Sequence, residues 1–157
     1  MNGTDGKTTG RARVLVVDDE MPVAMMIVYL LTRAGCDAEA ALNAEQALRR
    51  AHTEPFDLIT LDIGMPGPDG FKLYLRLKEI PHLRETPVIF VSGQGTIEDQ
   101  RRALDLGAAD FIEKPFEARD FTSRILSCMN QTSCRRQIHI TRRASTAYRE
   151  NATPVES

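Results

Sequence analysis

Three short apolar runs constrain the fold of this chain of 157 residues more than any other feature. They are Val14–Val17, Leu58–Leu61 and Val88–Val91, and they are rich in β-branched residues with no regular polar alternation. Strands of this kind are typical of a parallel sheet that is covered on both faces. Two further segments, Asp37–Leu42 and Ala109–Glu113, are predicted as a weaker strand and a short fifth strand.

Amphipathic segments between these strands predict five helices. Residues 21–34 carry apolar side chains at helical spacing, and Gly35 follows as a helix stop. Asn43 is the predicted N-cap of the second helix, with Gln46 placed as in a capping box, and Pro55 breaks that helix. The other helices are predicted over residues 71–80, from near 96 to 107, and over 116–129.

Strands that alternate with helices predict an α/β fold with a doubly wound parallel sheet and helices on both faces. Ligands of such folds bind beyond the carboxyl ends of the strands. The polar residues that follow the predicted strands are therefore the first candidates for a functional site.

These strand ends bring together carboxylates, a hydroxyl and an ammonium group. The residues are Asp18, Asp19, Asp62, Ser92 and Lys114, with Glu20 following the first pair. Taken singly, each has an ordinary structural explanation, since aspartate commonly caps a helix and serine is common in turns. Their arrival at one edge of one sheet favours a shared site instead.

The chemistry of such a cluster is restricted. Neighbouring carboxylates raise one another's pKa, and a hard divalent cation relieves their repulsion. Magnesium suits a site with few carboxylates, retained waters and a phosphate oxygen. A carboxylate can itself attack a phosphoryl group, while the metal and a lysine neutralise the transferred charge. The cluster therefore predicts a phosphoryl-accepting aspartate beside a magnesium site.

Over residues 12–129 the chain resembles the receiver domain of two-component response regulators. The matching segments are Val-Leu-Val-Val-Asp-Asp-Glu (14–20), Asp-Leu-Ile-Thr-Leu-Asp-Ile-Gly-Met-Pro-Gly-Pro-Asp-Gly (57–70), Val-Ile-Phe-Val-Ser-Gly (88–93) and Phe-Ile-Glu-Lys-Pro-Phe (111–116). The resemblance implies a flavodoxin-like sheet of five parallel strands in the order 2-1-3-4-5, with five helices.

The resemblance also implies a role for each matching residue. Asp62 is the implied phosphoacceptor. The implied ligands of Mg²⁺ or Mn²⁺ are Asp18, Asp19, Asp62 and the backbone carbonyl of Gly64. The phosphoryl-binding and switch set consists of Lys114, Ser92, Gly93 and Phe111, and the structural residues are Pro115, Pro66 and Gly70. The Lys114–Pro115 bond is expected to be cis. Phe111 is expected to swing inward when Ser92 moves toward the phosphoryl group.

The implied function is that of a phosphoacceptor response regulator in a two-component system or phosphorelay. Its expected partners are a histidine kinase or histidine phosphotransfer protein, an unidentified downstream protein, and a second copy of the chain on phosphorylation. A phosphatase of the haloacid-dehalogenase type is disfavoured because Gly64 stands where that class needs an acid/base aspartate. A truncated receiver of a longer DNA-binding or enzymatic regulator remains the alternative.

Composition sets further limits. The net charge of −2 does not favour nucleic-acid binding through bulk charge, and the N-terminus lacks a signal-peptide pattern. The apolar stretch Val23–Leu31 is too short to span a bilayer, and the three cysteines fit reduced thiols in a cytoplasmic protein. The receiver resemblance implies that the chain is not an enzyme beyond phosphotransfer to itself and autodephosphorylation.

Three regions are predicted along the chain. Residues 1–12 form a flexible arm, 13–129 the receiver domain, and 130–157 a polar tail that carries five arginines against two glutamates. The tail shows no apolar period that could support a core, so we expect it to be disordered. Its charge also allows it to bind an acidic partner, or the acidic body of the same chain.

Overall fold

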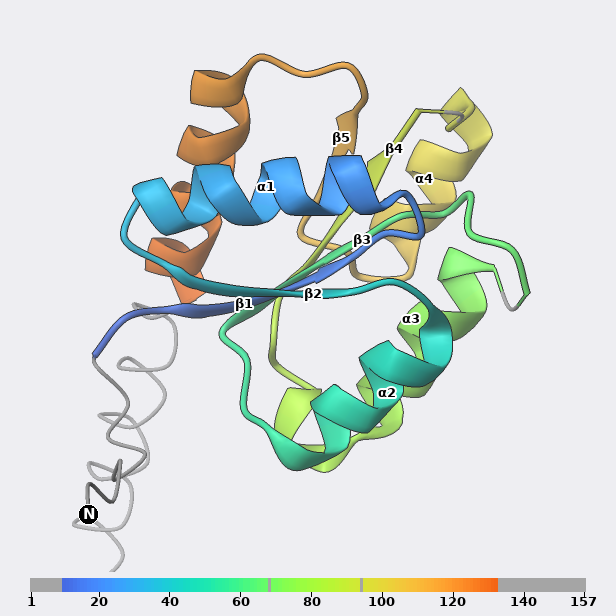
Figure 1. Cartoon of the computed structure of the whole chain (residues 1–157). Helices are drawn as coiled ribbons and strands as arrows, with labels where there is room; N and C mark the ends of the chain where they lie inside the picture. Colours follow the sequence, from blue (N-terminus) through green and yellow to red (C-terminus); the bar gives the residue numbers. More distant parts are fainter. Residues whose placement is uncertain (1–9, 68, 94, 133–157) are drawn as a thin grey trace, which may run out of the picture.

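Five parallel strands form the central sheet of the computed structural model, which describes residues 10–67, 69–93 and 95–132 (Figure 1). The strands are β1 (Arg13–Val17), β2 (Asp37–Ala41), β3 (Leu58–Leu61), β4 (Val88–Ser92) and β5 (Asp110–Glu113). Their order across the sheet is β2-β1-β3-β4-β5. The fold class and the strand order predicted from the sequence are both confirmed.

Helices cover both faces of the sheet (Figure 1). They are α1 (Met21–Arg33), α2 (Ala44–Thr53), α3 (Gly70–Glu79), the 3-10 helix η1 (Pro81–Leu83), α4 (Ile97–Asp105) and a C-terminal helix over residues 118–132. The first and the C-terminal helices lie on one face, and α2, α3 and α4 contribute to the core on the other.

The sheet separates two hydrophobic cores. Alternate residues of β1 illustrate the division, since Val14 and Val16 belong to the core under α1, whereas Leu15 and Val17 belong to the core under α2 and α3. All four side chains are fully buried. The unbroken apolar run of β1 is therefore explained by a strand that is covered on both sides.

The caps of two helices differ from the prediction. Gln46 does not complete a capping box at Asn43, because its side-chain oxygen accepts a bond from the backbone N–H of Leu42 rather than from that of Asn43. A full capping box instead joins Thr96 and Asp99 at the start of α4. The 3-10 helix after Pro81 was not predicted.

The C-terminal helix also differs from the prediction. It begins two residues later than expected and continues through residue 132, three residues beyond the predicted end. The predicted arm up to residue 9 and the predicted tail from residue 133 lie outside the described residues. Within the described part of the chain, no helix is long and apolar enough to cross a membrane.

Candidate functional site

Three aspartates meet at the carboxyl ends of β1 and β3. Backbone bonds extend both strands into the site, since the N–H of Asp62 donates to the carbonyl of Val17 at 3.0 Å and that of Asp18 donates to Ala41 at 3.1 Å. One carboxylate oxygen each from Asp18, Asp19 and Asp62 lies within 4.8 Å of the others. The structure thus brings together the three carboxylates that the sequence pointed to.

Lys114 joins this cluster from the end of β5. Its Nζ lies 2.6 Å from Oδ2 of Asp18 and 3.4 Å from Oδ2 of Asp62. The remaining oxygens of the two carboxylates accept backbone bonds, from Glu20 at 2.9 Å and from Gly64 at 3.0 Å. The ammonium group therefore lies nearer to Asp18 than to the predicted phosphoacceptor.

Burial and the neighbouring charges have opposite effects on the pKa values of Asp18 and Lys114. Burial raises the pKa of Asp18, although the bond from Lys114 and the N–H of Glu20 oppose that shift. Burial alone would lower the pKa of Lys114, but its bond to Asp18 and the charges of both carboxylates outweigh burial and raise it. Lys114 is therefore firmly protonated and is held as a cation among the aspartates.

A divalent cation fits the donor set of this site. All three side chains offer hard carboxylate oxygens, which Mg²⁺ prefers. Asp18 and Asp62 are buried while Asp19 is exposed, so the cluster has one side open to water. With the three carboxylates ionised, Lys114 balances only one of three negative charges, and a divalent ion would balance the rest.

The loop after Asp62 is held close to that aspartate by a glycine. A Cβ added to Gly70 would lie 2.6 Å from the backbone oxygen of Asp62 and 2.7 Å from Cα of Ile63. Gly70 also donates its N–H to the carbonyl of Ile63 at 3.3 Å. The predicted structural role of Gly70 therefore has a steric basis, whereas Pro66 lies exposed in the same loop.

The remaining predicted residues lie on β4, on β5 and in the segments that follow them. Ser92 is buried at the end of β4, and its carbonyl accepts the backbone N–H of Lys114 at 3.0 Å. Gly93 is exposed beside Lys114, and the Lys114–Pro115 peptide bond is cis, as predicted. Phe111 is buried, with its ring 6.3 Å from that of Phe90.

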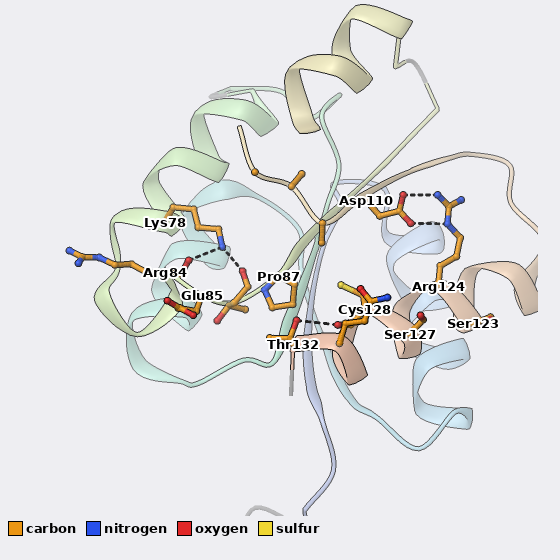
Figure 2. A pocket seen from close by; sticks show the side chains of 15 residues that line it. Lys78, Arg84, Glu85, Pro87, Asp110, Ser123, Arg124, Ser127, Cys128 and Thr132 are labelled. Carbon is orange, nitrogen blue, oxygen red and sulfur yellow. Dashed lines mark hydrogen bonds and ion pairs between the residues drawn. The ribbon is translucent and has the colours of Figure 1, made fainter. Parts of the chain in front are cut away.

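A polar depression of about 850 Å³ lies at the opposite ends of β4 and β5 (Figure 2). Lys78 crosses part of it and donates to the backbone carbonyls of Leu83, Arg84 and Thr86. Arg124 forms two bonds of 2.8 and 2.7 Å with the carboxylate of Asp110. Sequence patterns had not indicated either interaction, because both join residues without any periodic signal.

The bonds around this depression explain its charged residues structurally. Burial lowers the pKa of Lys78, yet its ammonium group is held by carbonyls at the end of η1 and before β4. The Asp110–Arg124 pair ties the start of β5 to the C-terminal helix. These groups therefore fasten segments together and give no separate evidence of chemistry.

The fold, the acidic cluster and Lys114 together are those of a signalling domain of the α/β class. The family model described as "Response regulator receiver domain" matches residues 14–126. The chain belongs to the response regulator receiver domain family of two-component systems.

Relatives and solved structures agree with this assignment. The chain is 34% identical over 123 residues to the transcriptional activator protein IrlR of Burkholderia pseudomallei. This match covers 78% of this chain and 52% of the relative. NtrX of Brucella abortus superposes with a TM-score of 0.79 at 32% identity, covering 84% of this chain and 30% of that one.

A shorter solved structure matches nearly end to end. The CheY-like receiver domain protein of Methanospirillum hungatei JF-1 superposes with a TM-score of 0.75 at 26% identity, covering 80% of this chain and 98% of that one. By contrast, the chain spans about half the length of the curated relatives that it matches. The shared part is thus the receiver domain.

Proposed function

We propose that the chain is a phosphorylation switch in which Asp62 accepts a phosphoryl group from a histidine kinase or a histidine phosphotransfer protein. The observation that carries this proposal is the meeting of Asp18, Asp19 and Asp62 within 4.8 Å, beside the ammonium group of Lys114. Membership of the receiver family supports the same reading.

Asp62 is the proposed nucleophile because its carboxylate is the less tightly held of the two buried ones. The Nζ of Lys114 lies 3.4 Å from Asp62 but 2.6 Å from Asp18, and the side chain of Asp62 is 9% exposed against 1% for Asp18. In the proposed transfer, a carboxylate oxygen of Asp62 forms the new P–O bond while the P–N bond to the donor histidine breaks. The histidine nitrogen leaves with the electron pair of that bond.

The other residues of the site prepare it for the transferred charge. Lys114 already lies between two carboxylates and is positioned to pair with a phosphoryl oxygen. Asp18, Asp19, Asp62 and the carbonyl of Gly64 would hold Mg²⁺ or Mn²⁺. The bound cation would supply neutralisation of the phosphoryl oxygens.

Ser92 and Phe111 connect the site to the surface made by α4, β5 and the C-terminal helix. Ser92 ends the strand that precedes α4, and its backbone is bonded to that of Lys114. A phosphoryl oxygen on Asp62 would offer the Ser92 hydroxyl a new acceptor and so favour one packing of this surface over another. We propose this surface for a downstream partner or for phosphorylation-dependent dimerisation.

Phosphorylation is tested by intact-mass spectrometry with a small-molecule phosphodonor, with and without Mg²⁺. The wild-type chain should gain the mass of one phosphoryl group only when Mg²⁺ is present. The matched control is Asp62→Asn, which keeps the size of the side chain and removes the nucleophile. Equal labelling of this variant would refute the assignment of Asp62.

A second candidate is a receiver that controls a DNA-binding region in the same polypeptide. It is favoured by the names of relatives such as the phosphate regulon transcriptional regulatory protein PhoB of Escherichia coli, about half of which matches this chain. The full-length coding sequence distinguishes this candidate from a separate receiver. A cytoplasmic location and a role of residues 130–157 in partner binding both stay predictions.

A further inference from the structure

Gly95, in the segment between β4 and α4, lies directly against the ring of Phe111. A Cβ added to Gly95 would lie 2.4 Å from Cζ of Phe111, 2.9 Å from Cε1 and 3.5 Å from Cε2. Real Cβ atoms almost never approach a neighbour below 3.0 Å. A side chain at position 95 therefore requires the Phe111 ring to shift.

The backbone does not explain this glycine. Gly35, Gly67 and Gly107 have positive φ values, which favour glycine for conformational reasons, but Gly95 is not among them. An alanine could therefore adopt the backbone conformation of residue 95. Among the described residues, the three nearest atoms that an added Cβ would meet all belong to the Phe111 ring.

The ring itself is tightly placed. Phe111 is 8% exposed and stacks on Phe90, with the ring planes 28° apart. Phe90 is fully buried and contacts the rings of Phe71 and Tyr74 at centroid distances of 5.3 and 5.6 Å. An added methyl group at position 95 would thus meet a ring that is backed by other rings.

The ring of Phe111 belongs to an edge strand of the sheet. This strand is β5, and α4 lies close to it. The cluster of rings around Phe90 also contacts the C-terminal end of α4, because the hydroxyl of Tyr74 donates to the carbonyl of Leu106 at 3.0 Å. A displaced Phe111 would alter the packing beneath α4.

We propose that Gly95 is a positioning residue of the switch, which allows Phe111 to be buried against position 95 without a phosphoryl group on Asp62. This inference rests on the proposed function, because it concerns how that switch is set. A side chain at position 95 would move the resting position of the ring outward. The position of the Phe111 ring in the unphosphorylated chain thus depends on a residue outside the acidic cluster.

The test compares the wild-type chain with Gly95→Ala, using ring-¹³C-labelled phenylalanine and a soluble paramagnetic chelate that broadens exposed rings. Phe111→Leu identifies the signal. Without a phosphoryl mimic, the wild-type Phe111 signal should be protected and that of Gly95→Ala broadened. Glu98→Ala is the control for ring position, because Glu98 is exposed in the first turn of α4, three residues from Gly95.

A double-variant cycle separates the ring from a general effect on the loop. Gly95→Ala should lower the midpoint of thermal unfolding in the wild-type background and leave it nearly unchanged in a Phe111→Ala background. This cycle stays informative even if Gly95→Ala alone unfolds, because the double variant should then fold. Equal losses in both backgrounds would overturn the proposal.

Two further results would also overturn it: a wild-type Phe111 ring that is exposed without the mimic, or a ring that stays protected in Gly95→Ala. Labelling of Asp62 is measured by mass in the same samples. If Asp62 is not labelled while the ring responds as expected, the proposed function fails and the packing inference stands. If Asp62 is labelled and the ring does not respond, the inference alone fails.

Discussion

At the scale of single residues, the site depends on how closely Gly70 allows the chain to approach Asp62. Gly70 begins α3, and its Cα faces the backbone of residues 62 and 63. Backbone atoms in the middle of the fold cannot yield as the end of a flexible side chain can. The close approach therefore fixes both the loop and the carboxylate that precedes it.

Gly70→Ala should destabilise the protein. Helix propensity alone would favour alanine by up to about 1 kcal/mol, but overpacking against a fixed backbone costs about 1–3 kcal/mol, so the clash should outweigh the gain. Denaturant unfolding measures the difference. Gly64→Ala is the control, since its Cβ would lie 3.7 Å from Oδ1 of Asp62. Equal stability of the two variants would contradict this steric account.

Magnesium should stabilise the fold through the acidic cluster. Linkage predicts about 2.7 kcal/mol at a hundredfold excess over the dissociation constant. Asp19→Ala should remove most of that gain by removing an exposed ligand, whereas Asp105→Ala, exposed on α4, should keep it. Thermal melts with and without Mg²⁺ make the comparison. A magnesium shift of wild-type size in Asp19→Ala would argue against the site.

The residues of the site could be predicted from the sequence, but the pairing of their side chains could not. The aspartates and Lys114 could be predicted because each follows a strand, and parallel strands end at one edge. The preference of Lys114 for Asp18 over Asp62 depends on side-chain packing that no spacing encodes. Gly95 was missed for the same reason, because its need for glycine arises from a ring 16 positions away in the chain.

At the scale of elements, the C-terminal helix is attached to the sheet mainly by apolar contacts. Phe121 is fully buried in the core under α1, and its ring stacks on that of Phe116 at a centroid distance of 4.4 Å. Arg124 adds its paired bonds to Asp110. The helix therefore belongs to the folded domain and can respond to changes at β5.

Phe121→Ala should cost about 3–5 kcal/mol of unfolding free energy, as is usual for a fully buried aromatic residue. Phe116→Ala is the control, because that ring is only partly buried and should cost clearly less. Denaturant unfolding gives both values. A loss under about 1 kcal/mol for Phe121→Ala would mean that the helix is not anchored as described.

Phosphorylation should reach α4 through Ser92 and the segment that follows it. Adding beryllofluoride, which mimics a phosphoryl group, should shift backbone NMR signals across Ile97–Asp105 as well as around Asp62. The physical reason is the new acceptor offered to the Ser92 hydroxyl, which biases the packing of α4. Shifts confined to the acidic cluster would contradict this coupling.

The elements that were predicted well are those whose burial dictates their pattern. β1, β3 and β4 are buried at nearly every position and read as apolar runs. β2 was only a weak candidate because it lies at an edge and holds Asp37 and Glu39, which take part in ion pairs with Arg13. The 3-10 helix Pro81–Leu83 is too short to show any period.

At the scale of the whole molecule, the strand order connects the acidic cluster to the surface that we propose for partners. The acidic cluster lies at the ends of the central strands β1 and β3. Strands β4 and β5 lead from it toward one edge of the sheet, where α4 contacts β5 and Arg124 of the C-terminal helix pairs with Asp110. Lys114 and Ser92 stand where these two regions meet. A charge change on Asp62 is thereby adjacent to the surface that we propose for partners.

The measurement that tests this account most directly is the identification of the modified residue. The chain is phosphorylated with a small-molecule donor and Mg²⁺, the acyl phosphate is reduced with borohydride, and the peptides are analysed by mass spectrometry. The account predicts that aspartate is converted to homoserine at Asp62 and not at Asp18 or Asp19. Conversion at either of those residues, or none in a folded chain with Mg²⁺ present, would contradict it.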